Sequence, residues 1–127
     1  MGYRRGGFTL IELLIVVVII GVLAAIAVPK FQSTKGKAYL ASMKSDLRNL
    51  TVAEEEYYYE HRTYTTVLDS LQFVPSHGVV LTITEADASG WGATSTHPEA
   101  WPHMCAIFYE SVTPVAPAAT EGQVACQ

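Results

Sequence analysis

An apolar run from Phe8 to Val28 constrains this chain more than any other feature, because Glu12 is the only charge within it. Coiled as an α-helix, about 21 residues would span roughly 31 Å, which is close to the hydrocarbon thickness of a bilayer. A core helix of a soluble domain would normally show a polar face at this length, and this run shows none. The run therefore predicts a membrane-spanning helix.

The charges on either side of the run favour one orientation. Arg4 and Arg5 precede it and favour a cytoplasmic N-terminus, although Lys30, Lys35 and Lys37 follow it and weaken the bias. This orientation also places the two cysteines in an oxidising space. A secretory signal is the main alternative, but its apolar region would be only about 7–15 residues long and would carry no acid.

The sequence GGFTLIELLIVVVIIGVLAAIAVP, residues 6–29, resembles the N-terminus of type IV pilins and type II secretion pseudopilins. The matching features are a short basic leader ending in Gly7, then Phe8, Thr9 and Glu12, and the helix residues Gly21 and Pro29. The resemblance implies that a prepilin peptidase cuts after Gly7 and N-methylates Phe8. A residue without Cβ suits such a cut, because a protease can approach its backbone closely. The chain would then be a substrate of that peptidase and not an enzyme.

Glu12 has two interpretations. It could be tolerated as an interfacial residue, because an acid near the end of a span costs less than the roughly 2.5–3.5 kcal/mol that it costs at the centre. The resemblance instead implies a role in subunit assembly, in which Glu12 pairs with the cationic α-amine that cleavage creates on Phe8 of a neighbouring subunit. Such a pair fixes register, because a mismatch leaves two uncompensated charges.

Gly21 and Pro29 should weaken the same helix. A helical glycine costs roughly 1 kcal/mol relative to alanine, and Pro29 lacks an N–H and presses on the carbonyl of Ala25. We expect a kink in the subunit. The resemblance further implies melting between Gly21 and Pro29 in an assembled filament.

The helical pattern continues beyond Pro29 to about Arg62. Apolar residues recur at three- and four-residue steps and predict a buried stripe of Leu40, Met43, Leu47, Leu50, Ala53 and Tyr57. The charged residues expected mostly on other faces are Lys44, Asp46, Arg48, Glu54, Glu55 and Glu60. We therefore divide the chain into a leader (1–7), a transmembrane and filament-core helix (8–28), its amphipathic continuation (29–62) and a head (63–127).

The head is expected to be a small antiparallel β-sheet of about three strands packed on the long N-terminal α-helix, an α+β fold of the type IV pilin kind. Strands are expected within residues 78–86, 91–97 and 104–112, with a hairpin loop at 87–90. Cys105 and Cys126 flank a loop rich in proline and alanine. Two cysteines fit one disulfide or two free thiols, and we favour a disulfide that pins the C-terminal tail to the third strand.

No catalytic residue set, phosphate-binding loop or basic aromatic patch is evident in the sequence. His77, His97 and His103 lack a regular ligand spacing and are expected at the surface or in loops. Glu85 and Asp87 do not form the dense run of oxygen ligands that calcium loops need. We predict no metal and no cofactor, and the net charge of −4 argues against direct nucleic acid binding.

These features lead to a structural hypothesis. The subunit would be held in the inner membrane, and the pilus assembly machinery would join it to copies of itself in an extracellular helical filament that serves adhesion, twitching motility or DNA uptake. The alternative is a pseudopilin whose periplasmic filament drives protein export in type II secretion. A third alternative, a membrane-anchored binding or enzymatic domain, is the least supported, because the small head shows no catalytic set.

Overall fold

The computed structural model describes residue 2 and residues 6–110 and 112–127. Most of the predicted leader, including Arg4 and Arg5, lies outside the described residues, as does Ser111 near the end of the third expected strand. The chain divides into two compact units, residues 1–35 and 36–127. This boundary falls within the segment predicted as the amphipathic continuation of the helix.

A single helix, α1, extends from Leu10 to His61. These bounds confirm the long helix expected from near Phe8 to near Arg62. Its end has a clear physical cause, because Arg62 adopts a left-handed conformation with φ of 59°. The Arg62 N–H still donates to the Tyr58 carbonyl at 2.8 Å, which satisfies one of the last free carbonyls of the helix.

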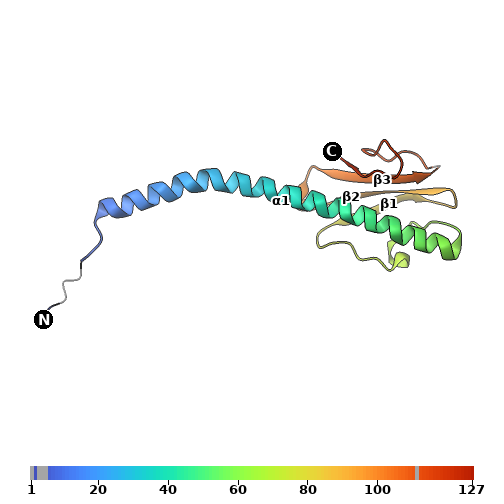
Figure 1. Ribbon diagram of the computed structural model, residues 1–127, viewed down its shortest axis with the longest axis horizontal. Coiled ribbons are helices and arrows are strands. Elements are labelled where there is room, and N and C mark those ends of the chain that lie inside the picture. The colour runs from blue at the N-terminus through green and yellow to red at the C-terminus, as the bar shows by residue number, and fades with distance from the viewer. Residues whose placement is uncertain (1, 3–5, 111) are drawn as a thin grey trace. The chain divides into compact units, whose positions relative to one another are not determined.

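The second unit packs the C-terminal half of α1 along one face of a four-stranded antiparallel sheet (Figure 1). The strands follow chain order: β1 (Val80–Ala86), β2 (Gly90–Thr96), β3 (Met104–Glu110) and β4 (Ala125–Cys126). The β1–β2 turn is built on Asp87, whose carboxylate accepts from the Ser89 and Gly90 N–H groups at 2.6 and 3.1 Å. The predicted α+β fold, the hairpin at residues 87–90 and the positions of three strands are confirmed.

The helical stripe in the core includes three of the predicted apolar residues, Met43, Leu47 and Leu50, all fully buried. The prediction that Asp46 and Glu54 occupy other faces is wrong, since their exposed fractions are 3 % and 0 %. The reason is spacing. Both acids lie three or four residues from a buried apolar residue, so helical geometry places them on the buried stripe despite their charge.

The central strands are buried on both faces, which explains why β2 does not alternate between apolar and polar residues. One face meets α1, and the C-terminal loop covers the other, where Ala106, Phe108 and Ala118 form a second small core with Val115 beside it. Gly92 makes this cover possible, because a Cβ there would lie 2.6 Å from a Val115 methyl group.

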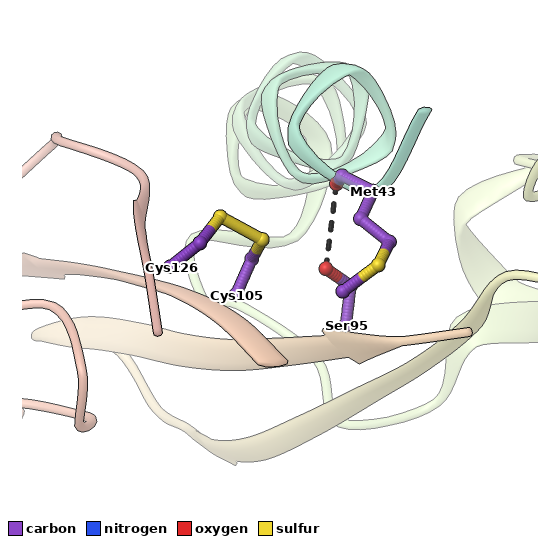
Figure 2. The surroundings of a disulfide bond; sticks show 4 residues. All are labelled: Met43, Ser95, Cys105 and Cys126. Atoms are coloured by element: carbon purple, nitrogen blue, oxygen red, sulfur yellow. Dashed lines mark hydrogen bonds between the residues drawn. A yellow bond between two sulfur atoms is a disulfide. The ribbon is translucent and has the colours of Figure 1, made fainter. Parts of the chain in front are cut away.

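The C-terminal tail forms a fourth strand that the sequence pattern did not predict. Strand β4 has two residues and pairs Cys126 with Cys105 and Ala125 with Ala106 of β3. A disulfide joins the same two cysteines, as predicted, and so holds the tail against β3. Figure 2 shows the disulfide beneath α1, beside Ser95, whose hydroxyl donates to the Met43 carbonyl at 3.4 Å.

Two short 3₁₀ helices lie in the connections, η1 (Leu68–Leu71) before β1 and η2 (Pro98–Ala100) between β2 and β3. His97 precedes η2 and accepts from the Glu99 N–H at 3.1 Å. Its ring stacks on Tyr39 of α1 with 4.0 Å between centroids, and it is 6 % exposed. His97 therefore lies in a loop, as predicted, but it is buried there as a packing and capping residue.

Candidate functional site: the N-terminal segment and the buried carboxylates of the long helix

The predicted cleavage site lies just before the first turn of α1. Gly7 and Phe8 are outside the helix and exposed, with 90 % of Phe8 accessible. No heavy atom would lie within 4 Å of a Cβ on Gly7 apart from its chain neighbours. The peptide bond between these residues is thus accessible in this segment, although cleavage itself stays a prediction.

Thr9 and Glu12 form a reciprocal capping box at the start of α1. The Thr9 N–H and hydroxyl donate to Glu12 Oε2 at 2.8 and 2.9 Å, and the Glu12 N–H is 3.3 Å from Thr9 Oγ1. A capping box satisfies two N–H groups that a helix start would otherwise leave free. This box is not among the sequence predictions above, although its signature, a threonine followed three residues later by glutamate, is present in the sequence as TLIE.

The capping box uses only one of the two carboxylate oxygens of Glu12. Both hydrogen bonds that Glu12 accepts from Thr9 end on Oε2. Within the described part of the chain, Oε1 accepts no hydrogen bond. Thr9 and Glu12 both lie after the predicted cut, so cleavage would preserve the box. Glu12 can therefore hold the helix start through one oxygen and offer the other to a cation.

The apolar part of α1 is not covered by any of the described residues of the first unit. Every large apolar side chain from Phe8 to Phe31 is about half exposed or more. The helix is long and apolar enough to cross a membrane by length and composition. Bare apolar surface of this extent is unfavourable in water, so another apolar phase must cover it.

Gly21 and Pro29 both lie inside α1, which is assigned as α-helix through both positions. Pro29 cannot donate the hydrogen bond that a helical residue normally gives to the carbonyl four residues earlier. Gly21 has open space where a Cβ would project. Melting between these residues in a filament stays a prediction.

Two buried carboxylates fasten the segment after α1 to the helix. Asp46 accepts from the Ser76 N–H at 2.7 Å and from its hydroxyl at 2.9 Å. Glu54 Oε2 accepts from the Thr65 N–H at 3.1 Å, whereas Glu54 Oε1 is buried with no hydrogen-bond partner. The segment from Thr65 to Ser76, which contains η1, is therefore held at both ends by acids that we had expected on other faces.

Burial raises the pKa of Glu54 to about 7, because the charged form loses water that the protein only partly replaces. The Thr65 N–H lowers this pKa, and the neighbouring Glu55 carboxylate raises it. Glu55 itself accepts from the Tyr64 hydroxyl at 3.0 Å. Protonation of Glu54 is thus coupled to the packing of α1 against the segment that follows it.

Among the residues that the structure describes, no three histidine, cysteine or acidic side chains lie together as metal ligands would. His97 packs on Tyr39, and the cysteines form a disulfide.

Comparison with known proteins supports the same reading of the N-terminus. Residues 3–28 match the family model described as the prokaryotic N-terminal methylation motif. The chain is 40 % identical over 75 residues to the type IV major pilin protein PilA of Myxococcus xanthus, covering 59 % of this chain and 34 % of that protein. It is 38 % identical over 71 residues to the type II secretion system core protein G of Pectobacterium carotovorum, covering 56 % and 46 %.

A third similar protein is the fimbrial protein EcpB of Eikenella corrodens, which is 47 % identical over 53 residues, or 42 % of this chain and 33 % of that protein. The predicted resemblance to type IV pilins and type II secretion pseudopilins is thereby confirmed. The aligned part spans between a third and a half of these three relatives.

Proposed function

We propose that this chain is a structural subunit of a type IV pilus-like filament, held in the inner membrane before assembly with its N-terminus in the cytoplasm. The observation that carries the proposal is the N-terminal segment, where a methylation motif and an acid in its first helical turn precede an uncovered apolar helix. In the membrane, lipid would cover that helix. In a filament, the same helix of other copies would cover it.

Under this proposal the chain is a substrate and not an enzyme. A prepilin peptidase cuts after Gly7 and methylates Phe8, and the assembly machinery then moves the subunit from lipid into the filament. Glu12 of one subunit neutralises the α-amine of Phe8 on its neighbour. The free Oε1 of Glu12 supports this role, since the capping box does not consume the whole carboxylate.

Type II secretion is a second candidate with its own support, because the core protein G of several bacteria is among the similar proteins. The filament would then be a periplasmic pseudopilus that drives protein export. The two candidates share processing, membrane storage and helical assembly, and they differ in where the filament ends and what it does. Adhesion, twitching motility and DNA uptake belong to the first candidate alone.

Two measurements on cells that express the chain test the shared part. Mass spectrometry of the mature protein should find an N-methylated Phe8 as the first residue, and electron microscopy should show filaments labelled by antibody to the head. An unprocessed N-terminus or a lack of filaments would contradict the proposal.

Deletion of each assembly system separates the candidates. If deletion of the pilus system abolishes long surface filaments and leaves exoprotein release intact, the first candidate holds. If deletion of the secretion system abolishes short periplasmic filaments together with exoprotein release, the second holds.

A further inference from the structure

Beyond the membrane segment, α1 carries a stripe of cations on one of its faces. Lys37, Lys44 and Arg48 are spaced by seven and four residues, which places them one above another along the helix. Lys37 and Arg48 are exposed and Lys44 is partly exposed. Within the described part of the chain, none of the three has an ion pair or hydrogen bond. We call these three residues the basic stripe.

A pocket of about 570 Å³ lies on another flank of α1, between the helix and the segment that contains η1. Two carboxylates line it, Glu56 and Glu60, and the described residues of its lining include no lysine or arginine. Val52, Leu71 and Phe73 contribute apolar surface to the same pocket. Both carboxylates are exposed and neither has a partner in the described part of the chain. We call this site the acidic pocket.

Each patch is unfavourable in the isolated chain. Lys44 and Arg48 are four residues apart, as are Glu56 and Glu60, and like charges at this spacing on a helix repel each other. Neither pair makes an ion pair within the described residues. The two patches nevertheless complement each other, because the apolar side chains in the pocket lining suit the methylene stem of a lysine or arginine, while the two carboxylates receive its cationic end.

Geometry prevents the two patches of one chain from meeting. They lie on the same rigid helix, and the spacing from Arg48 to Glu56 and Glu60 rotates the acids onto a different face from the stripe. The complementary partner of each patch is therefore a patch on a second copy. A contact of this kind joins two different surfaces, so it repeats from copy to copy without closing a dimer.

We propose that the basic stripe of one subunit docks in the acidic pocket of the next, as the head-to-tail contact between the amphipathic parts of α1. This inference rests on the proposed filament function and deepens it by naming the partner surface. The contact would act outside the apolar helices. Salt would screen this charged contact, whereas salt does not weaken the packing of the apolar helices, so the two can be distinguished.

Charge reversal in the full-length chain tests this contact in cells that assemble the wild-type protein. The stripe variant is Lys44→Glu/Arg48→Glu, and the pocket variant is Glu56→Lys/Glu60→Lys. We expect each variant alone to lower filament yield at least about tenfold, since like charges now face each other at the contact. The variant with all four changes should recover most of the yield.

Co-expression of the two variants is a more stringent test. The stripe variant is acidic on both patches and the pocket variant is basic on both. The two variants should therefore form filaments in which they alternate, although neither assembles alone. The matched control, Lys44→Arg/Arg48→Lys, keeps every charge and should assemble like the wild type. Equal subunit levels and an intact disulfide on a non-reducing gel show that a loss of filaments is not a loss of fold.

Crosslinking tests the direction of the contact. A chain with Arg48→Cys and Glu60→Cys, treated in filaments with a short bismaleimide, should give a ladder of multimers, whereas each single change should give none. Dimers from either single change would overturn the head-to-tail arrangement. Wild-type filaments together with unchanged yield in both reversal variants would overturn this contact alone, and a wild type without filaments would overturn it along with the proposed function.

Discussion

Glu12 is the residue at which capping and charge can be separated by experiment. A glutamine at this position can still accept from Thr9 and close the capping box, but it carries no charge. We expect Glu12→Gln and Glu12→Ala to be cut after Gly7 as efficiently as the wild type and to assemble poorly. Immunoblots for the processed subunit and filament yield by shearing measure the two steps.

The pair of variants distinguishes the two roles of Glu12. If the charge that would meet the α-amine of Phe8 is required, glutamine fails as alanine does. Wild-type filament yield from Glu12→Gln would show that the capping box alone is needed and would remove the pairing role.

Glu54 makes the stability of the head depend on pH. Its pKa rises from 4.5 to about 7 on folding, so between these values the folded chain binds more protons than the unfolded chain. The stabilisation from protonated Glu54 is therefore complete below about pH 4.5 and is lost as the pH rises through 7. At about 1.4 kcal/mol for each pKa unit, the difference between 4.5 and about 7 limits the loss to at most roughly 3.5 kcal/mol.

Thermal unfolding of the full chain in detergent, followed by the fluorescence of buried Trp91, measures this dependence. We expect Glu54→Gln to remove the component of the pH dependence between about pH 4.5 and 7 and to be more stable than the wild type at pH 8. Glu56→Gln is the matched control, because Glu56 is exposed on the same helix and should leave the slope unchanged. An identical slope in Glu54→Gln and the wild type would contradict the assignment.

At the scale of secondary structure elements, sequence periodicity predicts the longer helix and strands, but it misses an element whose position depends on a single contact. The long helix and three strands follow from patterns of several residues, and these were placed to within a few positions. Strand β4 has only two residues, too few to show alternation, and its position is set by the disulfide between Cys105 and Cys126.

The candidate site was predictable to a similar degree. The cleavage motif is contiguous and was found, whereas Asp46 and Glu54 were missed because their charge was given more weight than their spacing. Their burial depends on Ser76 and Thr65, which donate from another segment of the chain. Such partners are brought together only by the tertiary fold, so sequence spacing alone could not identify them.

The disulfide between Cys105 and Cys126 links β3 to β4 and should contribute to the stability of the head. It closes a loop with a sequence separation of 21 residues, for which the chain-entropy model gives a stabilisation of about 3 kcal/mol. We expect Cys105→Ser/Cys126→Ser to lower the free energy of unfolding by roughly that amount and to expose the C-terminal tail to carboxypeptidase. The matched control is the wild type with its disulfide intact, which should resist digestion under the same conditions; equal digestion would contradict the prediction.

At the scale of the whole molecule, the two units differ in how much apolar surface they leave exposed. All of the buried apolar side chains named in the core lie at Met43 or beyond it, inside the unit of residues 36–127. The described residues of the unit 1–35 contribute exposed apolar surface and no buried apolar side chain. Under the proposed function, lipid or other subunits would cover this first unit.

This division predicts the behaviour of a shortened chain. Residues 36–127 alone should be soluble without detergent and elute as a monomer, because the removed segment carries the bare apolar helix and the remaining core is complete. The disulfide should form, and the unfolding curve should keep the pH dependence that Glu54 confers on the full chain. Size-exclusion chromatography, thiol labelling and fluorescence measure these three properties, and an aggregated or unfolded product would show that the core depends on the first unit.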